Sequence, residues 1–189
     1  MNWWRRVRRL TTGLLFVVSF GLQSLSLADQ SAPELSALFE QLRVAEEGSE
    51  AAALEQAIWA HWLTGPDKAS DQMMLQIQSA LQLGRHELGL VLCNQLVDAY
   101  PDYAEAWNKR ATLLYLLKRH EESVVDIRTT LELEPNHFGA LSGLGLILLS
   151  AGDAEGALHA FEEVLSINPL SKSAELNAAR ARAKIGTDI

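Results

Sequence analysis

The chain has 189 residues, with 16 Lys and Arg against 24 Asp and Glu, which gives a formal net charge of −8. A chain this acidic is repelled by phosphate backbones and anionic lipid headgroups, so nucleic acids and membrane surfaces are disfavoured as partners. Cys93 is the only cysteine, so no internal disulfide can form and stability must come from packing.

Residues 1–28 have the pattern of a secretory signal. Four arginines lie among the first nine residues, an apolar segment spans 13–22, and Ser26 and Ala28 supply the small residues that a signal peptidase requires. We therefore expect cleavage after Ala28, export and a periplasmic location. The alternative is an uncleaved segment that anchors the protein in the membrane, because residues 10–28 carry no charge.

Residues 33–69 are expected to form a degenerate helical pair that covers the first full repeat of the array described next. Apolar residues recur at helical spacing over 35–42 and again over 54–62. Trp59 and Trp62 leave two interpretations open. Either one is a core residue that the other shields, or the pair is an exposed aromatic anchor for a partner or a second copy of the chain.

Three prolines, Pro101, Pro135 and Pro169, are separated by two equal intervals, and each follows an apolar helical run. Each run is expected to end there, because the residue before a proline is pushed out of the α region. Within one such interval the apolar residues recur at spacings of three and four, which predicts two antiparallel helices per unit. The three units are 70–103, 104–137 and 138–171.

Small residues are expected at the eighth and twentieth positions of each unit, where its two helices cross closely. Gly145 and Ala157 satisfy this rule in the third unit. In the first unit Ile77 is large, but Gly89 opposite it is the smallest residue available, so the summed volume is roughly conserved.

Residues 172–185 are expected to form a C-terminal capping helix. Repeat arrays need such a cap because the last unit would otherwise expose its apolar face. The residues expected to face inward are Leu176, Ala179 and Ala183, and those expected to face outward are Arg180, Arg182 and Lys184.

Residues 70–171 resemble the tetratricopeptide repeat (TPR) superfamily, whose units are about 34 residues long, in their period and in the pattern of the third unit, from Leu141 through Gly145 to Pro169. The runs 58–62 and 107–111 also resemble uncharacterised bacterial exported TPR proteins. The superfamily resemblance implies an all-α fold, a short right-handed superhelical solenoid of antiparallel helix pairs with capping helices at both ends. It also implies a concave groove, lined by the first helix of each unit, that holds a peptide or partner segment.

The family's groove positions, carried over unit by unit, imply a specific partner-binding surface. Asn108 and Gln78 are expected to hydrogen-bond a ligand backbone, whereas Met74 and Tyr115 are expected to offer apolar pockets. Gly139 is expected to leave room for a ligand to enter. The full set of groove residues is Met74, Gln78, Leu81, Asn108, Thr112, Tyr115, Ser142, Leu146 and Leu149.

The best-known ligand mode of this family clamps a C-terminal carboxylate between basic and asparagine side chains. This sequence departs from that mode, because the matching positions hold Met74 and Gln78 in the first unit and Gly139 and Gly143 in the third. An apolar peptide or an amphipathic helix is therefore the expected ligand.

No catalytic, metal-binding or cofactor-binding residue stands out. The five histidines lack metal-ligand spacing, and Ser142–Gly145 lies inside a predicted helix, where a phosphate-binding loop is excluded. Cys93 occupies a phenylalanine position of the repeat and is expected to be a buried hydrophobe. We expect a non-enzymatic adaptor in the bacterial envelope. The alternatives are a self-associating structural module, which would be a homo-oligomer, and an enzyme with an unrecognised site.

Overall fold

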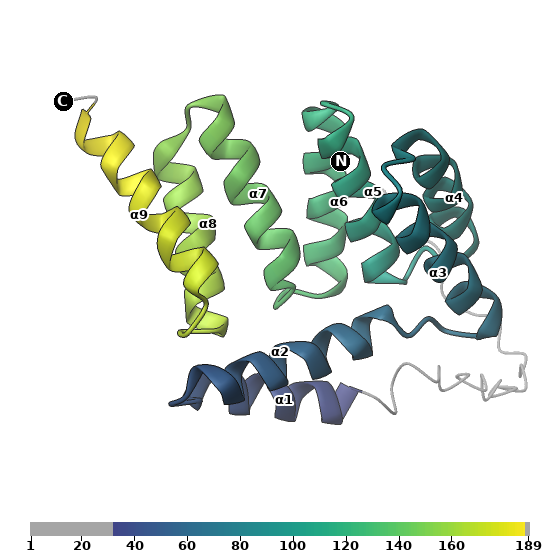
Figure 1. The fold of residues 1–189 in the computed structure, drawn as a ribbon, viewed down its shortest axis with the longest axis horizontal. Coiled ribbons are helices and arrows are strands. Elements are labelled where there is room, and N and C mark those ends of the chain that lie inside the picture. The colour runs from purple at the N-terminus through teal and green to yellow at the C-terminus, as the bar shows by residue number, and fades with distance from the viewer. Residues whose placement is uncertain (1–31, 188–189) are drawn as a thin grey trace, which may run out of the picture.

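The structure is a computed structural model that describes residues 32–187, and within that range it contains nine α-helices and no strand (Figure 1). The all-α prediction is therefore confirmed for this part of the chain. The expected export signal, residues 1–28, lies outside the described residues. None of the described helices is both long and apolar enough to cross a membrane. The helices are α1 (Ala32–Val44), α2 (Gly48–Leu63), α3 (Lys68–Gln82), α4 (His86–Ala99), α5 (Ala104–Leu116), α6 (His120–Leu133), α7 (Phe138–Ala151), α8 (Ala154–Ile167) and α9 (Lys172–Thr187).

Six of these helices form three consecutive antiparallel pairs, α3–α4, α5–α6 and α7–α8, and α9 packs against α8. Figure 1 shows these helices standing side by side in chain order, so that the array is a short solenoid. The predicted solenoid of helix pairs is confirmed. Each pair coincides with one period of the sequence, because the apolar stripe of a single pair is buried only when the next pair stacks on it.

The turn inside each pair requires a residue with a left-handed backbone. Gly84 (φ +66°), Lys118 (φ +65°) and Gly152 (φ +89°) hold this position, which recurs once in every period. Glycine adopts this conformation freely, whereas a residue with a Cβ pays roughly 1 kcal/mol for it. The middle turn is therefore strained at Lys118, although the fold keeps the same geometry there.

Close helix crossings explain the small residues that the repeat requires. A Cβ built on Gly145 would lie 2.6 Å from the Phe161 ring, so this glycine lets α7 approach α8. In the middle pair the Ser123 hydroxyl donates a hydrogen bond to the Ala111 carbonyl at 2.8 Å, which satisfies a buried polar group at the equivalent crossing. In the first pair, Gly89 faces Leu113 of the following pair.

The single cysteine is part of the core. Cys93 is fully buried on α4 and packs in a cluster with Met74, Ile77 and Leu96. Burial raises the pKa of the Cys93 thiol to about 12, because the thiolate would lose its hydration. Its expected role as a small buried hydrophobe agrees with this placement.

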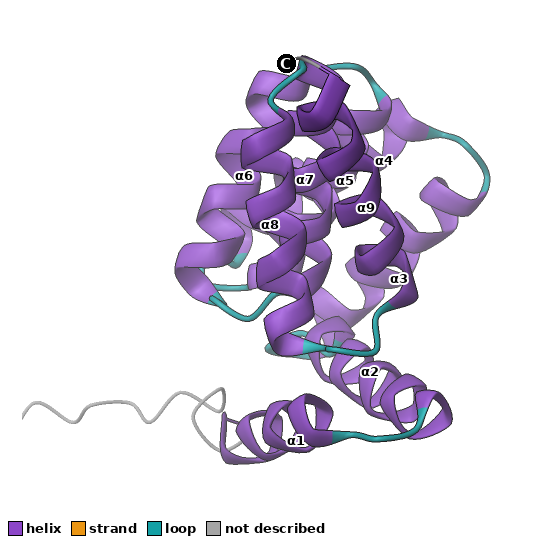
Figure 2. Cartoon of the chain, turned by 90° about the vertical axis from the view of Figure 1, so that its left-hand side faces the viewer, coloured by secondary structure: helices purple, strands orange, loops and turns teal. Residues whose placement is uncertain are grey.

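The N-terminal helical pair does not stack on the first repeat as predicted. The α1–α2 hairpin, residues 32–63, instead runs across the ends of the repeat helices, and Figures 1 and 2 show it lying crosswise beneath them. Its main contacts outside the hairpin join α2 to α5 and α1 to α8. The prediction was wrong because the large apolar side chains of the hairpin are buried against the ends of α7 and α8 and not against the first repeat. That shared core includes Phe39, Leu42, Ile58 and Trp62 from the hairpin, and Phe138, Leu141, Val164 and Ile167 from α7 and α8.

The C-terminal helix packs through a different face from the one predicted. Its buried residues are Ala174, Ala178 and Ala181, whereas the side chain of Leu176 is 55% exposed and Ala179 and Ala183 also face solvent. Two of the buried alanines, Ala178 and Ala181, share a core with Phe161. Both stripes have helical spacing, and the alanine stripe is preferred because small side chains let α9 lie close to α8.

Candidate binding groove

The nine predicted groove residues all lie on α3, α5 and α7, the first helices of the three pairs. Their exposure divides them into three groups. Thr112 and Leu146 are exposed, and Met74 and Asn108 are buried. The remaining five are half-buried: Gln78, Leu81, Tyr115, Ser142 and Leu149.

Met74 and Asn108 were expected to contact a ligand, but both side chains are buried. Met74 is only 1% exposed, because it fills the core between α3 and α4 beside Ile77 and Leu96. Asn108 is 6% exposed, and its Nδ2 donates a hydrogen bond of 2.7 Å to Glu105 Oε2. A buried methionine cannot contact a ligand, and an amide that already has an internal hydrogen bond gains little from one, so both residues are removed from the predicted contact set.

Glu105 lies at the centre of a buried polar cluster that the sequence did not reveal. Its side chain is fully buried, with Oε2 2.9 Å from His137 Nε2 and Oε1 2.6 Å from Lys109 Nζ. The Ala140 amide donates to His137 Nδ1 at 3.2 Å, so Nε2 is the ring nitrogen that carries the proton toward Glu105. His137 thereby also caps the first turn of α7.

The surroundings of Glu105 favour its charged form. Burial alone raises the pKa of Glu105, but the hydrogen bond from His137 and the nearby charge of Lys109 outweigh burial. The net result is a pKa below the ordinary value. Glu105 therefore stays ionised in the interior, with its charge shared among fixed donors.

This lowered pKa predicts a pH dependence of stability. The unfolded state binds the proton of Glu105 more tightly than the folded state does, so the stabilisation is complete above the unfolded pKa of about 4.3 and is lost as the pH falls through the lower folded value. The difference in unfolding free energy between the wild type and Glu105→Gln should shrink below about pH 4.3 when it is measured by urea denaturation. A difference that stays constant down to about pH 3 would contradict this assignment.

Two tryptophans of α2 cover this cluster. The Trp62 ring stacks on His137 with a centroid separation of 3.9 Å, and Trp59 meets Trp62 edge-on at 5.1 Å. Lys109 Nζ lies 5.2 Å from the centre of the Trp59 ring. Trp62 is buried and Trp59 is half-buried, so the arrangement is that of a core tryptophan with a second one beside it as a shield.

Gly139 is not an open entrance to the groove. A Cβ at Gly139 would lie 2.6 Å from Cη2 of Trp59, so the space that the glycine leaves is filled by the indole ring of the same chain. The end of the groove formed by the first turns of α5 and α7 is thus closed by the α1–α2 hairpin.

The opposite end of the groove is open. A hollow of about 480 Å³ lies between α7 and α9, and its lining includes the predicted groove residues Leu146 and Leu149. The α9 side of this hollow was not among the predicted groove residues. A signal was present, because Arg180, Ala183 and Lys184 follow Leu146, Leu149 and Ser150 by one period of the repeat.

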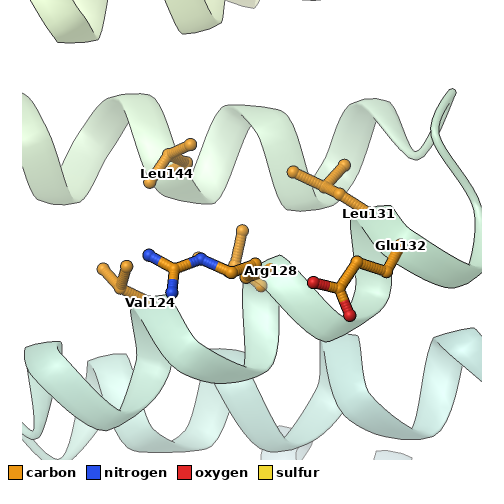
Figure 3. A pocket seen from close by; sticks show the side chains of 6 residues that line it. Val124, Arg128, Leu131, Glu132 and Leu144 are labelled. Carbon is orange, nitrogen blue, oxygen red and sulfur yellow. The ribbon is translucent and has the colours of Figure 1, made fainter. Parts of the chain in front are cut away.

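A second hollow of about 260 Å³ lies between α6 and α7, where Leu144 of α7 faces Val124 and Arg128 of α6 (Figure 3). It contains none of the predicted groove residues. Across residues 32–187, no group of three or more His, Cys, Asp and Glu side chains is placed to hold a metal ion.

Three stacked antiparallel helix pairs, with exposed residues on the first helix of the second and third pairs, place this chain in the class of helical repeat proteins. A tetratricopeptide repeat family matches residues 74–127 and 126–174. The chain is also similar to a TPR repeat-containing protein of Rhizobium etli, with 33% identity over 141 residues that cover 75% of this chain and 69% of that protein. The chain therefore belongs to the tetratricopeptide repeat family.

Solved structures with the same fold include peptide complexes. The first TPR domain of Spaghetti bound to an HSP90 peptide matches with a TM-score of 0.60 and 17% identity, covering 62% of this chain and 93% of that one. The Hsp70 complex of the TPR2B domain of yeast Sti1 matches with a TM-score of 0.59 and 14% identity, covering 62% and 99%. At these identities the likeness shows the fold alone.

Proposed function

We propose that this protein is a non-enzymatic adaptor of the bacterial envelope that binds a peptide or helical segment of a partner in the groove of α3, α5 and α7. The observation that carries the proposal is an open strip on neighbouring helices, in which Thr112 of α5 and Leu146 of α7 are exposed and Tyr115 of α5 and Leu149 of α7 are half-buried. An apolar strip edged by small hydroxyls suits a segment that presents an apolar face.

Two further observations support this proposal. Two solved structures of the same fold are complexes with an HSP90 peptide and with Hsp70. The buried polar cluster of Glu105 is engaged in internal contacts that hold α5 and α7 together, which leaves the open strip as the surface for a partner. The envelope location rests on the signal-like pattern of residues 1–28.

A capture experiment tests the groove. The affinity-tagged protein should retain a partner from an envelope extract. The combined change Thr112→Arg, Tyr115→Ala and Leu146→Ala should abolish that capture, because the arginine obstructs the strip and the two alanines remove its apolar contacts. The partner is identified by mass spectrometry of the retained fraction, and circular dichroism checks that the variant remains helical.

The matched control is Val125→Ala with Leu133→Ala, which changes two exposed apolar residues of α6 outside the groove. This control should retain the partner. Loss of capture in the control, or undiminished capture by the groove variant, would rule out the groove as the working surface. Recovery of the bait alone, with self-association in sedimentation, would favour the structural-module alternative.

A further inference from the structure

The α7 side of the open hollow is apolar and uncharged. No charged residue occurs between Phe138 and Ala151. Leu146, in the middle of this helix, is a large apolar residue that is 37% exposed. Leu149 is half-buried beside it, and Ser150 forms the edge. An exposed leucine beside a hollow of about 480 Å³ offers a seat for a large apolar side chain.

The α9 side of the same hollow is cationic. Arg180 and Lys184 are one turn apart and line the hollow together with Ala183. None of the ion pairs formed within residues 32–187 involves Arg180, whose hydrogen bond goes to Asn177 at 3.4 Å. Arg182, only two residues away, instead pairs with Glu162 at 2.8 Å. The guanidinium of Arg180 therefore keeps its capacity for a bidentate carboxylate.

The two acidic residues of helices α3, α5 and α7 are Glu105 and Asp71, and both have partners within the chain. Glu105 is buried against His137 and Lys109, and Asp71 accepts a hydrogen bond of 2.8 Å from the Gly65 amide. No acidic residue lines the α7–α9 hollow within residues 32–187, and its charged lining residues are Arg180 and Lys184, of which Lys184 also donates a hydrogen bond to the Leu149 carbonyl at 3.4 Å. The local charge there is positive, although the chain as a whole carries a formal charge of −8. A local reversal of sign selects for ligands of the opposite charge.

We propose, building on the proposed groove function, that the α7–α9 hollow binds an acidic amphipathic segment of another polypeptide. A large aliphatic or aromatic side chain of that segment sits against Leu146 and Leu149. An aspartate or glutamate within one turn of it pairs with Arg180. The apolar floor favours a polypeptide over a phosphate ligand, which would leave both leucines unused.

The experiment uses fluorescence anisotropy with the full chain. The probe is a fluorescein-labelled peptide of about 14 residues, long enough for roughly four helical turns. It has leucine on one face, glutamate on the other, and an amidated C-terminus, so that no terminal carboxylate contributes. A second probe carries lysine in place of each glutamate. The full chain should bind the glutamate probe at least about tenfold more tightly than the lysine probe.

The variant Arg180→Gln should weaken binding of the glutamate probe about tenfold, because one charge-assisted pair is lost. The matched control is Arg182→Gln on the same helix, which removes an equal charge that is already paired with Glu162, and it should leave probe binding unchanged. Both substitutions lie at exposed positions of α9, and circular dichroism checks that each variant remains folded.

Equal affinity for the two probes, or equal losses in the Arg180 and Arg182 variants, would overturn the proposal. So would self-association that disappears in Arg180→Gln while neither probe binds, since the occupant would then be a second copy of the chain. If Arg180→Gln still captures the envelope partner that the groove variant loses, the adaptor function stands and the acidic-segment proposal fails. If the groove variant keeps its partner, the adaptor function itself fails.

Discussion

Replacing Glu105 with alanine should lower the free energy of unfolding by about 3–5 kcal/mol, the range found when one partner of a buried ion pair is removed. The change leaves His137 Nε2 and Lys109 Nζ without the acceptor that holds them at 2.9 and 2.6 Å. The loss exceeds that of a surface pair because His137 is fully buried and water cannot replace the missing oxygen. Urea denaturation followed by circular dichroism measures it.

The control for this prediction is Glu122→Ala. Glu122 also pairs with a cation, Arg119 at 2.6 Å, but both side chains are exposed, so solvent replaces the lost partner. Its denaturation midpoint should stay close to that of the wild type. If the two alanine variants shifted the midpoint equally, the buried cluster would not be the element that joins α5 to the start of α7.

The second large effect is expected from Trp62→Ala, which should cost about 3–5 kcal/mol of packing free energy. The Trp62 ring is buried against His137, at 3.9 Å between centroids, and against Phe138 at 4.8 Å. Because the shared core is the main attachment of the α1–α2 hairpin, we expect the hairpin to detach while the repeats remain folded. Limited proteolysis should then cleave within residues 32–67, and thermal unfolding should begin at a lower temperature.

Val44→Ala provides the comparison, because Val44 lies in the same hairpin and its side chain is 75% exposed. It should leave the proteolysis pattern unchanged. Resistance of the Trp62→Ala hairpin to protease, together with an unchanged unfolding curve, would show that other contacts hold the hairpin in place.

The repeat architecture could be predicted from the sequence because its determinants are local and periodic. Pro101, Pro135 and Pro169 and the small residues at the helix crossings recur once in every period. The same register extends to Arg180, but the inward face of the capping helix was predicted from Leu176, Ala179 and Ala183. The alanine face proved to be the packed one, because a close crossing rewards small volume over hydrophobicity.

The features that escaped prediction depend on contacts without a period. Glu105 and His137 are 32 residues apart, and nothing in either repeat unit marks them as partners. The docking of Trp59 against Gly139 joins α2 to α7, and a single sequence carries no signal of such a long-range pairing. Met74 and Asn108 were wrongly predicted to contact a ligand, because a repeat position predicts which side of the helix a residue occupies and not how deeply its side chain is buried.

The indole of Trp59 fills the space beside Gly139, so this side chain competes with any ligand for that end of the groove. A tethered group acts at an effective concentration on the order of millimolar, whatever the concentration of free ligand. A segment arriving from another molecule must therefore outcompete that tethered ring to reach the first turns of α5 and α7, whereas none of the described residues places an aromatic ring in the hollow beside α9. The groove is thus asymmetric, and if a partner binds there as proposed, its orientation should be set partly by Trp59, which closes one end.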